Sequence, residues 1–353
     1  MSQPPGLAAR LESAVVDIAV ALLPVLLFLG LLVLLDSFKL VSLRSVLAAL
    51  VAGAVAAIFG AQLNAWLLDA SGWSGPAFSR YAAPPIEEGL KALWIVILLR
   101  RGRVGFLVDA AILGFAVGAG FALVENVEYL RALSERELGL WLVRGLGTAI
   151  LHGATTAIVA ILAKGLGDRH PGWPLLSLLP GYLAAVAIHS AYNHHLLPPL
   201  LSAAVLLVGL PLVVIAVFER SERRTRDWMG LGLDTELEVV ESIASGQVLD
   251  SRIGHYLGSL KQRFPGEVVA DMLCLLRIQA ELSIRAKGLL LAREAGLEPA
   301  VGADVRDRLT ELRYLERSIG RTGLIAMQPI TRRDTRALWQ VYLLEQAGAT
   351  RRP

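Results

Sequence analysis

The sequence predicts an all-α protein, in which about seven transmembrane helices form a polytopic membrane part and a small soluble helical domain follows. Of the 353 residues, 55% are hydrophobic and only 18% are charged, whereas soluble proteins are about 45–50% apolar and about 25% charged. The charges are also uneven: residues 1–218 hold 13 Lys/Arg and 12 Asp/Glu, and residues 219–353 hold 21 and 19. We therefore expect a transmembrane domain over 1–218 and a soluble domain over 219–353.

Seven apolar stretches in the first part are long enough to cross a bilayer, which takes about 20 residues of helix. They lie near residues 13–35, 46–68, 80–99, 105–130, 141–163, 174–196 and 198–218. The first stretch is longer than the apolar region of a signal peptide, and no small-residue cleavage site follows it. We therefore interpret it as a retained helix.

The loops between these stretches predict the orientation. If the helices alternate in direction, eleven Lys and Arg residues fall on one side, Arg100 and Arg101 among them, and five fall on the other, Arg80 and Arg131 among them. Cytoplasmic loops carry the excess of positive charge. We therefore expect the N-terminus outside and the C-terminal domain in the cytoplasm.

The C-terminal region is predicted to be a small helical bundle. Apolar residues repeat at helical spacing over 266–295, where Gly296 is a typical stop, and again from Val305 to Ile319. Thr331 is a typical cap for a third helix that would end near Glu345. No pattern in this region indicates what it does.

Composition excludes several classes of site and partner. Cys274 is the single cysteine, so neither an intramolecular disulfide nor a cysteine-based zinc site is possible. The net charge is only +3, and both signs are mixed throughout the tail. We therefore expect no nucleic-acid partner.

Four of the expected spans contain ionisable side chains, each of which costs at least about 2.5–3.5 kcal/mol in a bilayer. They are Glu87, Glu88 and Lys91 in the third span, Glu125 in the fourth, His152 in the fifth and His189, with Asn193, in the sixth. At about 1.5 Å per residue, Glu88, Glu125 and the two histidines each lie roughly 9–16 Å from the outer boundary. Chance placement would scatter them over about 30 Å, so we expect one shared site in the outer half of the membrane.

Local spacing supports such a site. Lys91 follows Glu87 by four residues and Glu88 by three, so it can neutralise one of the carboxylates. Pro84 and Pro85 remove backbone donors and predict an open helix start just before the glutamates.

The later spans carry matching features. His189 and Asn193 share a helix face at a spacing of four residues. Gly114, Gly118 and Gly120 predict that the fourth helix approaches its neighbours closely.

The chemistry of this cluster indicates a hydrolytic metal site. Carboxylates and imidazoles are typical zinc ligands, and such a set can leave one position for water. The ion would acidify that water and polarise a peptide carbonyl, while a spare carboxylate takes the proton. However, none of the spacings is the HExxH zinc motif, and each group alone also fits a structural ion pair or a polar clamp between helices.

At these residues the chain resembles the PrsW family of intramembrane proteases and, more distantly, the CAAX-protease-like superfamily. The family has a Glu-Glu-x-x-Lys helix, a Phe-x-x-x-Glu helix and two later histidine helices. Here they stand, in this order, as Glu87 to Lys91, Phe121 to Glu125, His152, and His189 to Asn193. The match covers about residues 80–196, and loosely all of 1–218.

The resemblance implies a peptidase of the bacterial plasma membrane that cleaves membrane proteins, with anti-sigma factors as the kind of substrate. It implies Glu87 as the base that activates water and places Lys91 and Asn193 in the catalytic site. Glu88, Glu125, His152 and His189 would be ligands of a zinc ion or proton partners. The division of roles between Glu87 and Glu88 stays open, as does a metal-free mechanism in which a glutamate activates water.

Two other classes of function fit part of the pattern. A proton- or ion-coupled transporter would also use buried carboxylates, but transporters commonly have two related halves, and the sequence has no second Glu-Glu-x-x-Lys copy. An inactive membrane scaffold would signal through its tail. The complete set of motifs favours the enzyme over both, although the sequence predicts neither the oligomeric state nor a particular substrate.

Overall fold

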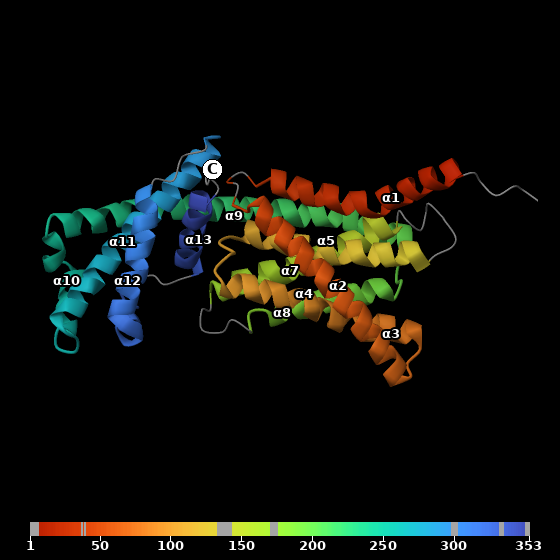
Figure 1. The fold of residues 1–353 in the computed structure, drawn as a ribbon, viewed down its shortest axis with the longest axis horizontal. Helices are drawn as coiled ribbons and strands as arrows, with labels where there is room; N and C mark the ends of the chain where they lie inside the picture. The colour runs from red at the N-terminus through yellow and green to blue at the C-terminus, as the bar shows by residue number, and fades with distance from the viewer. Residues whose placement is uncertain are drawn as a thin grey trace, which may run out of the picture. The chain divides into compact units, whose positions relative to one another are not determined.

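The computed structural model describes residues 7–36, 38, 40–132, 143–169, 176–297, 303–331 and 335–349. All regular elements in these ranges are helices, which confirms the all-α prediction (Figure 1). The chain divides into two compact units. The first runs to Ser221, except for the short loops 37–39 and 101–105, which belong to the second unit together with the chain from Glu222 onward.

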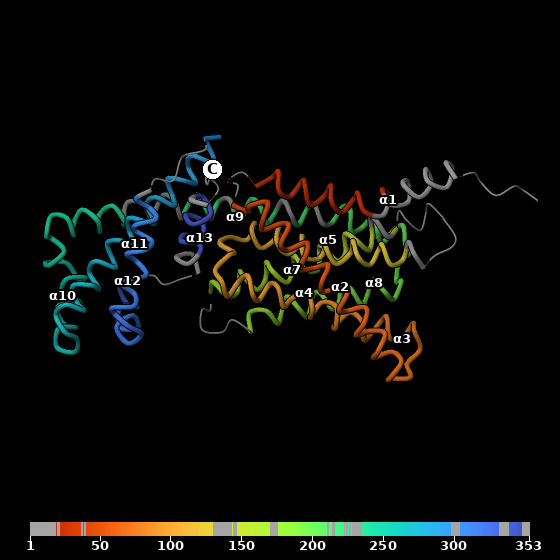
Figure 2. Tube along the Cα trace, viewed as in Figure 1, coloured from red at the N-terminus to blue at the C-terminus, as the bar shows by residue number. Residues whose placement is uncertain are grey.

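The helices of the first unit follow the apolar stretches of the sequence, and Figure 2 traces their path. They are α1 (Leu7–Leu34), α2 (Leu43–Ser71), α4 (Ala83–Arg100), α5 (Leu107–Ala132), α7 (Ala149–Gly167), α8 (Leu179–Asn193) and α9 (Pro199–Ala244). The short helix α3 (Gly75–Tyr81) precedes α4, and a π-helical turn, η1 (Val143–Thr148), precedes α7. The first residues of the expected fifth and sixth spans, 141–142 and 174–175, lie outside the described residues.

Among the described residues, three helices are long and apolar enough to cross a membrane: Leu43–Ser71, Leu107–Tyr129 and Ala149–Gly167. Leu22–Leu34 and Pro199–Gly209 are shorter apolar helical stretches. Two other expected spans differ for physical reasons, since α4 carries two glutamates, a lysine and a terminal arginine within 18 residues and α8 has only 15 residues. The structure therefore confirms the prediction of seven spans in part.

Local sequence explains where several helices begin and end. Ser42 caps α2 by accepting a hydrogen bond from the backbone N–H of Ser45, and Gly72 ends it in the left-handed conformation. Pro84 and Pro85 lie in the first turn of α4, where proline is tolerated. The helix α9 continues past residue 218 into the charged segment, because Glu and Arg are strong helix formers.

Helix α5 forms the centre of the first unit. It packs against α1, α2 and α7, and most of its apolar stretch is buried. A Cβ atom added at Gly118 would lie 2.0 Å from the carbonyl oxygen of His152, and one at Gly120 would lie 2.0 Å from that of Leu50. This confirms the close approach of α5 to its neighbours that the glycines predict.

The second unit is a helical bundle around α11. It contains the last part of α9, η2 (Gln247–Asp250), α10 (Arg252–Leu260), α11 (Gly266–Glu294), α12 (Ala303–Ala326) and α13 (Thr335–Ala349). Helix α11 packs against α10, α12 and α13, and Gly296 follows it with a positive φ, as predicted for a stop. The described part of α13 begins at Thr335, four residues after Thr331, whose buried hydroxyl donates to the carbonyl of Met327 at 3.0 Å.

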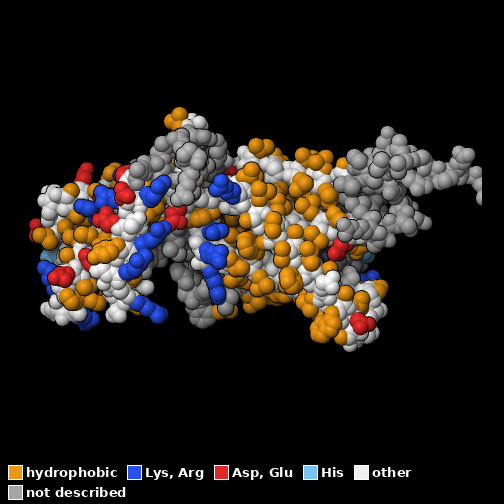
Figure 3. All heavy atoms as spheres, in the orientation of Figure 1, with side chains coloured by type: hydrophobic (Ala, Val, Ile, Leu, Met, Phe, Trp, Pro, Cys, Tyr) orange, Lys and Arg blue, Asp and Glu red, His pale blue; other side chains and the backbone are white. Residues whose placement is uncertain are grey.

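Surface chemistry separates the two units. Figure 3 shows hydrophobic side chains covering the visible face of the first unit, whereas Lys, Arg, Asp and Glu are spread over the second. Within the second unit, the Lys287 ammonium is buried and donates to Glu236 at 2.7 Å, and the Ser283 hydroxyl donates to the other oxygen of that carboxylate at 2.6 Å. The loop 101–105 belongs to this unit because the Trp339 indole lies against Gly105.

Candidate functional site

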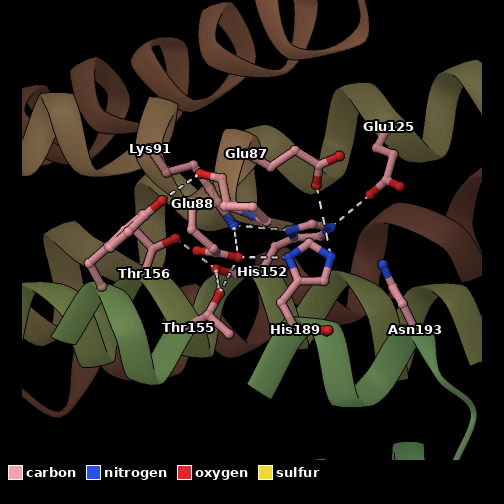
Figure 4. Close-up of polar contacts among 12 residues, drawn as sticks. Glu87, Glu88, Lys91, Glu125, His152, Thr155, Thr156, His189 and Asn193 are labelled. Atoms are coloured by element: carbon pink, nitrogen blue, oxygen red, sulfur yellow. Dashed lines mark hydrogen bonds and ion pairs between the residues drawn. The ribbon is translucent and has the colours of Figure 1, made fainter. Parts of the chain in front are cut away.

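Four helices bring the predicted ionisable residues together (Figure 4). Helix α4 contributes Glu87, Glu88 and Lys91, α5 contributes Glu125, α7 contributes His152 and α8 contributes His189. Hydrogen bonds or ion pairs join each of these residues to at least one of the others. The convergence of four antiparallel helices that the sequence predicts is therefore present in the structure.

Glu88 lies at the buried end of the cluster and is inaccessible to solvent. Its Oε1 atom accepts hydrogen bonds from Lys91 Nζ at 2.8 Å, from Thr155 Oγ1 at 3.2 Å and from His189 Nδ1 at 2.8 Å. Within the described part of the chain, its buried Oε2 atom has no hydrogen-bond partner. The three donors hold the carboxylate as an anion and fix its direction.

The bond to Glu88 determines the state of His189. A carboxylate only accepts hydrogen bonds, so the Nδ1–H group of His189 is the donor, and in the neutral imidazole its Nε2 atom carries a lone pair. That nitrogen faces Glu87 Oε2 at 3.8 Å. With a neutral imidazole two acceptors face each other, an arrangement that a cation between them stabilises.

Lys91 determines the state of His152 in the same way. Its ammonium has only donors and lies 3.1 Å from His152 Nδ1, so the imidazole proton is on Nε2, which lies 2.8 Å from Glu125 Oε2. The two imidazoles are perpendicular, with ring centroids 4.9 Å apart. The Phe121 ring packs beside His152 and under the lysine ammonium, which gives the aromatic residue of the Phe-x-x-x-Glu pattern a physical role.

Three residues could hold one ion between them. Glu87, His152 and His189 each offer one ligand atom, and these atoms all lie within 4.8 Å of one another. Glu88 and Glu125, which the resemblance implies as ligands, each contact an imidazole. Glu88 bonds to Nδ1 of His189, the nitrogen away from Glu87, as is typical of carboxylates that orient metal ligands.

Asn193 lies one helical turn beyond His189 on α8 (Figure 4). Its Nδ2 atom donates to the backbone carbonyl of Ser79 at 2.8 Å, which ties α8 to α3. This hydrogen bond joins Asn193 to a residue outside the cluster, whereas the other predicted site residues bond to one another.

The sequence reasoning missed two polar residues of the site. Thr155 donates to Glu88, and Asn64 on α2 donates from Nδ2 to Glu87 Oε1 at 2.9 Å. Thr155 stands three residues after His152, on the same helix face, and Asn64 is one of two amides, with Gln62, in a largely apolar span. Both signals are visible in the sequence, but neither residue is ionisable.

The fold and the site together define a helical membrane protein with a carboxylate and imidazole centre among its helices. Residues 38–218, just over half of the chain, match the family described as PrsW family intramembrane metalloprotease. The chain therefore belongs to this family, is a peptidase, and is an integral membrane protein. The comparisons with curated proteins and with solved structures give no match.

Proposed function

We propose that this protein hydrolyses peptide bonds of membrane proteins at a centre formed by Glu87, His152 and His189, with a divalent metal ion as cofactor. The observation that carries the proposal is the approach of His189 Nε2 to Glu87 Oε2 at 3.8 Å, with His152 close enough to complete the set. One carboxylate and two imidazoles favour zinc.

The residues around the three ligands support this assignment. Glu88 accepts the Nδ1–H group of His189 and so directs Nε2 toward Glu87. Lys91 donates to Nδ1 of His152, so Nε2, which bonds to Glu125, is the nitrogen that would hold the ion once its proton is released. A divalent ion held there would supply Lewis acidity, which polarises a peptide carbonyl and acidifies water.

Glu125 is the proton acceptor in this proposal. It bonds to His152 Nε2 and its side chain is 25% exposed, compared with 14% for Glu87 and none for Glu88. Ligation requires His152 Nε2 to release its proton. The partly exposed Glu125 carboxylate takes this proton and passes it to solvent, so that it is again free to accept one, while Nδ1 keeps the hydrogen bond from Lys91. The carboxylate then takes a proton from the attacking water and gives it to the nitrogen of the leaving amine.

Asn193 has a supporting role in the same reaction. It follows His189 by one helical turn, and rotation of its amide away from the Ser79 carbonyl turns a donor toward the substrate. An amide donor of this kind stabilises the negative charge that develops on the carbonyl oxygen during hydrolysis.

The proposed setting is a bacterial plasma membrane that the chain crosses seven times. The excess of Lys and Arg in alternate loops supports an outer N-terminus and a cytoplasmic C-terminal domain. The substrate would be a membrane protein cleaved in the outer half of the bilayer, and the family resemblance suggests an anti-sigma factor. No residue of the second unit indicates a nucleic-acid partner.

Metal analysis and a cleavage assay on the purified protein test this proposal. Glu87→Gln and His189→Ala should each lower bound zinc below one ion per chain and abolish cleavage, while folding is retained. The matched control is Glu128→Gln, which removes an exposed carboxylate from α5 and should change neither reading. A metal-free wild-type protein with full activity would instead support the glutamate-water mechanism.

A further inference from the structure

Asn64 is a polar residue of the site that none of the catalytic motifs includes. It lies on α2, which packs against α4, and its Nδ2 atom is 2.9 Å from Glu87 Oε1. Because an ionised carboxylate only accepts hydrogen bonds, the amide must turn its nitrogen toward Glu87. Its oxygen, Oδ1, then points away from the carboxylate.

The other end of the Asn64 amide is its Oδ1 atom. It is buried, and among the residues that the structure describes it has no hydrogen-bond partner. The described hydrogen bond of this side chain is therefore the one to Glu87, and its oxygen is left as an acceptor for water or for a peptide N–H.

The bond to Asn64 makes the two oxygens of Glu87 unequal. Oε1 is held by the amide, and Oε2 faces His189 Nε2 at 3.8 Å. Without the amide, the carboxylate would rotate freely, or would turn both oxygens toward the ion. We propose that Asn64 is a positioning residue that fixes the rotation of the Glu87 carboxylate and presents only Oε2 to the metal.

This inference rests on the proposed role of Glu87 as a ligand. The experiment measures zinc affinity in the full-length purified protein, by competition with a zinc-binding dye, before any assay of cleavage. Asn64→Leu keeps the approximate size and removes the donor. Asn64→Ala also removes the donor, with a smaller residue that favours helix. Both should weaken zinc binding by about 10–100-fold, the usual effect of losing a residue that orients a metal ligand.

Kinetics and a double variant give independent checks. At saturating zinc, kcat should fall while KM for a membrane-protein substrate stays within about twofold, because Glu87 holds the ion and not the substrate. In the Glu87→Gln background, Asn64→Leu should produce no further loss of zinc affinity, as expected when one residue acts through the other. The matched control is Gln62→Leu, which removes an exposed amide from the same helix and should change nothing.

The outcomes distinguish this inference from the proposed function. If Glu87→Gln leaves zinc affinity unchanged, Glu87 is not a ligand and the proposed function is wrong in that respect. If Glu87→Gln weakens zinc binding but both Asn64 variants bind zinc as the wild type does, only the positioning role is overturned. Additive losses in the double variant would also overturn it, since Asn64 would then act without Glu87.

Discussion

Lys91 affects the orientation or proton position of both histidines. Its ammonium donates to Glu88, which orients His189, and it also donates directly to His152. The lysine and Glu88 are both inaccessible to solvent. One buried cation therefore stabilises a buried anion and fixes the state of an imidazole at the same time.

Replacement of this lysine should destabilise the fold strongly. In Lys91→Met the Glu88 carboxylate keeps its charge but loses its cation, which typically costs about 3–5 kcal/mol in a buried pair. Unfolding of the purified protein in mixed detergent measures the change. The double variant Lys91→Met with Glu88→Gln should recover most of the loss, and the exposed Lys261→Met should have little effect. A stable Lys91→Met protein would show that Glu88 is held by its other donors.

Glu125 and Glu87 should respond differently to the same substitution. Glu125→Gln removes the proposed proton acceptor and should lower turnover by about 10²–10⁴-fold, with zinc content close to one ion per chain. Metal analysis of the purified variant beside its cleavage rate checks this. Loss of zinc from Glu125→Gln would instead make Glu125 a ligand, which is the role that the family resemblance first indicates.

At the scale of the helices, the site depends on the contact between α5 and α7. Gly118 has no side chain to separate them, and a Cβ atom there would meet the His152 carbonyl oxygen at 2.0 Å and the Gly153 Cα at 2.7 Å. Both of these atoms belong to the backbone, so they cannot move aside as a flexible side chain would. The position of His152 therefore follows from the packing of two helices as well as from its own bonds.

Gly118→Ala should separate α5 from α7 and move His152. Overpacking of this kind typically costs about 1–3 kcal/mol, and we expect both a lower unfolding temperature and a large loss of cleavage. Gly30→Ala is the matched control, because a Cβ atom there meets nothing within 4 Å. If Gly118→Ala cleaves at the wild-type rate, the close approach does not position the histidine.

The sequence predicts which helices meet but not how their side chains pair. Because buried charge is costly in a bilayer, the positions of Glu87, Glu88, Glu125 and the histidines along the chain are enough to identify the four helices of the site. The partners of each group depend on helix rotation and rotamers, which depth along a helix does not determine. For this reason the pairing of Glu88 with His189 and the contribution of Asn64 appear only in the structure.

The ends of the helices and of the two units were predictable from the sequence to different degrees. Apolar stretches locate the helices of the first unit, and Gly296 correctly indicates the end of α11. The change of composition at residue 218 does not interrupt α9, because a helix accepts apolar and charged residues alike. The connection of loop 101–105 to α13 depends on Gly105 and Trp339, which are 234 positions apart in the sequence, and no local pattern predicts it.

At the scale of the whole molecule, the proposed topology makes a prediction about access from the two sides of the membrane. Positions 74 and 101 flank α4, so one crossing places them on opposite sides. Positions 101 and 274 are separated by four proposed crossings, through α5, α7, α8 and α9, which places them on the same side. The loop charges assign the side of residue 101 to the cytoplasm.

Labelling of intact cells with a membrane-impermeant maleimide tests this arrangement, because the chain has a single, exposed cysteine at 274. In the wild type, Cys274 should react only after the cells are permeabilised. In a Cys274→Ser background, Ser74→Cys should react in intact cells and Arg101→Cys should not; both substituted positions are exposed. If Cys274 reacts and Ser74→Cys is protected, the orientation is inverted and the site would open toward the cytoplasm. If Ser74→Cys and Arg101→Cys react alike, α4 does not cross the membrane, and its glutamates and lysine are then buried by helix packing alone.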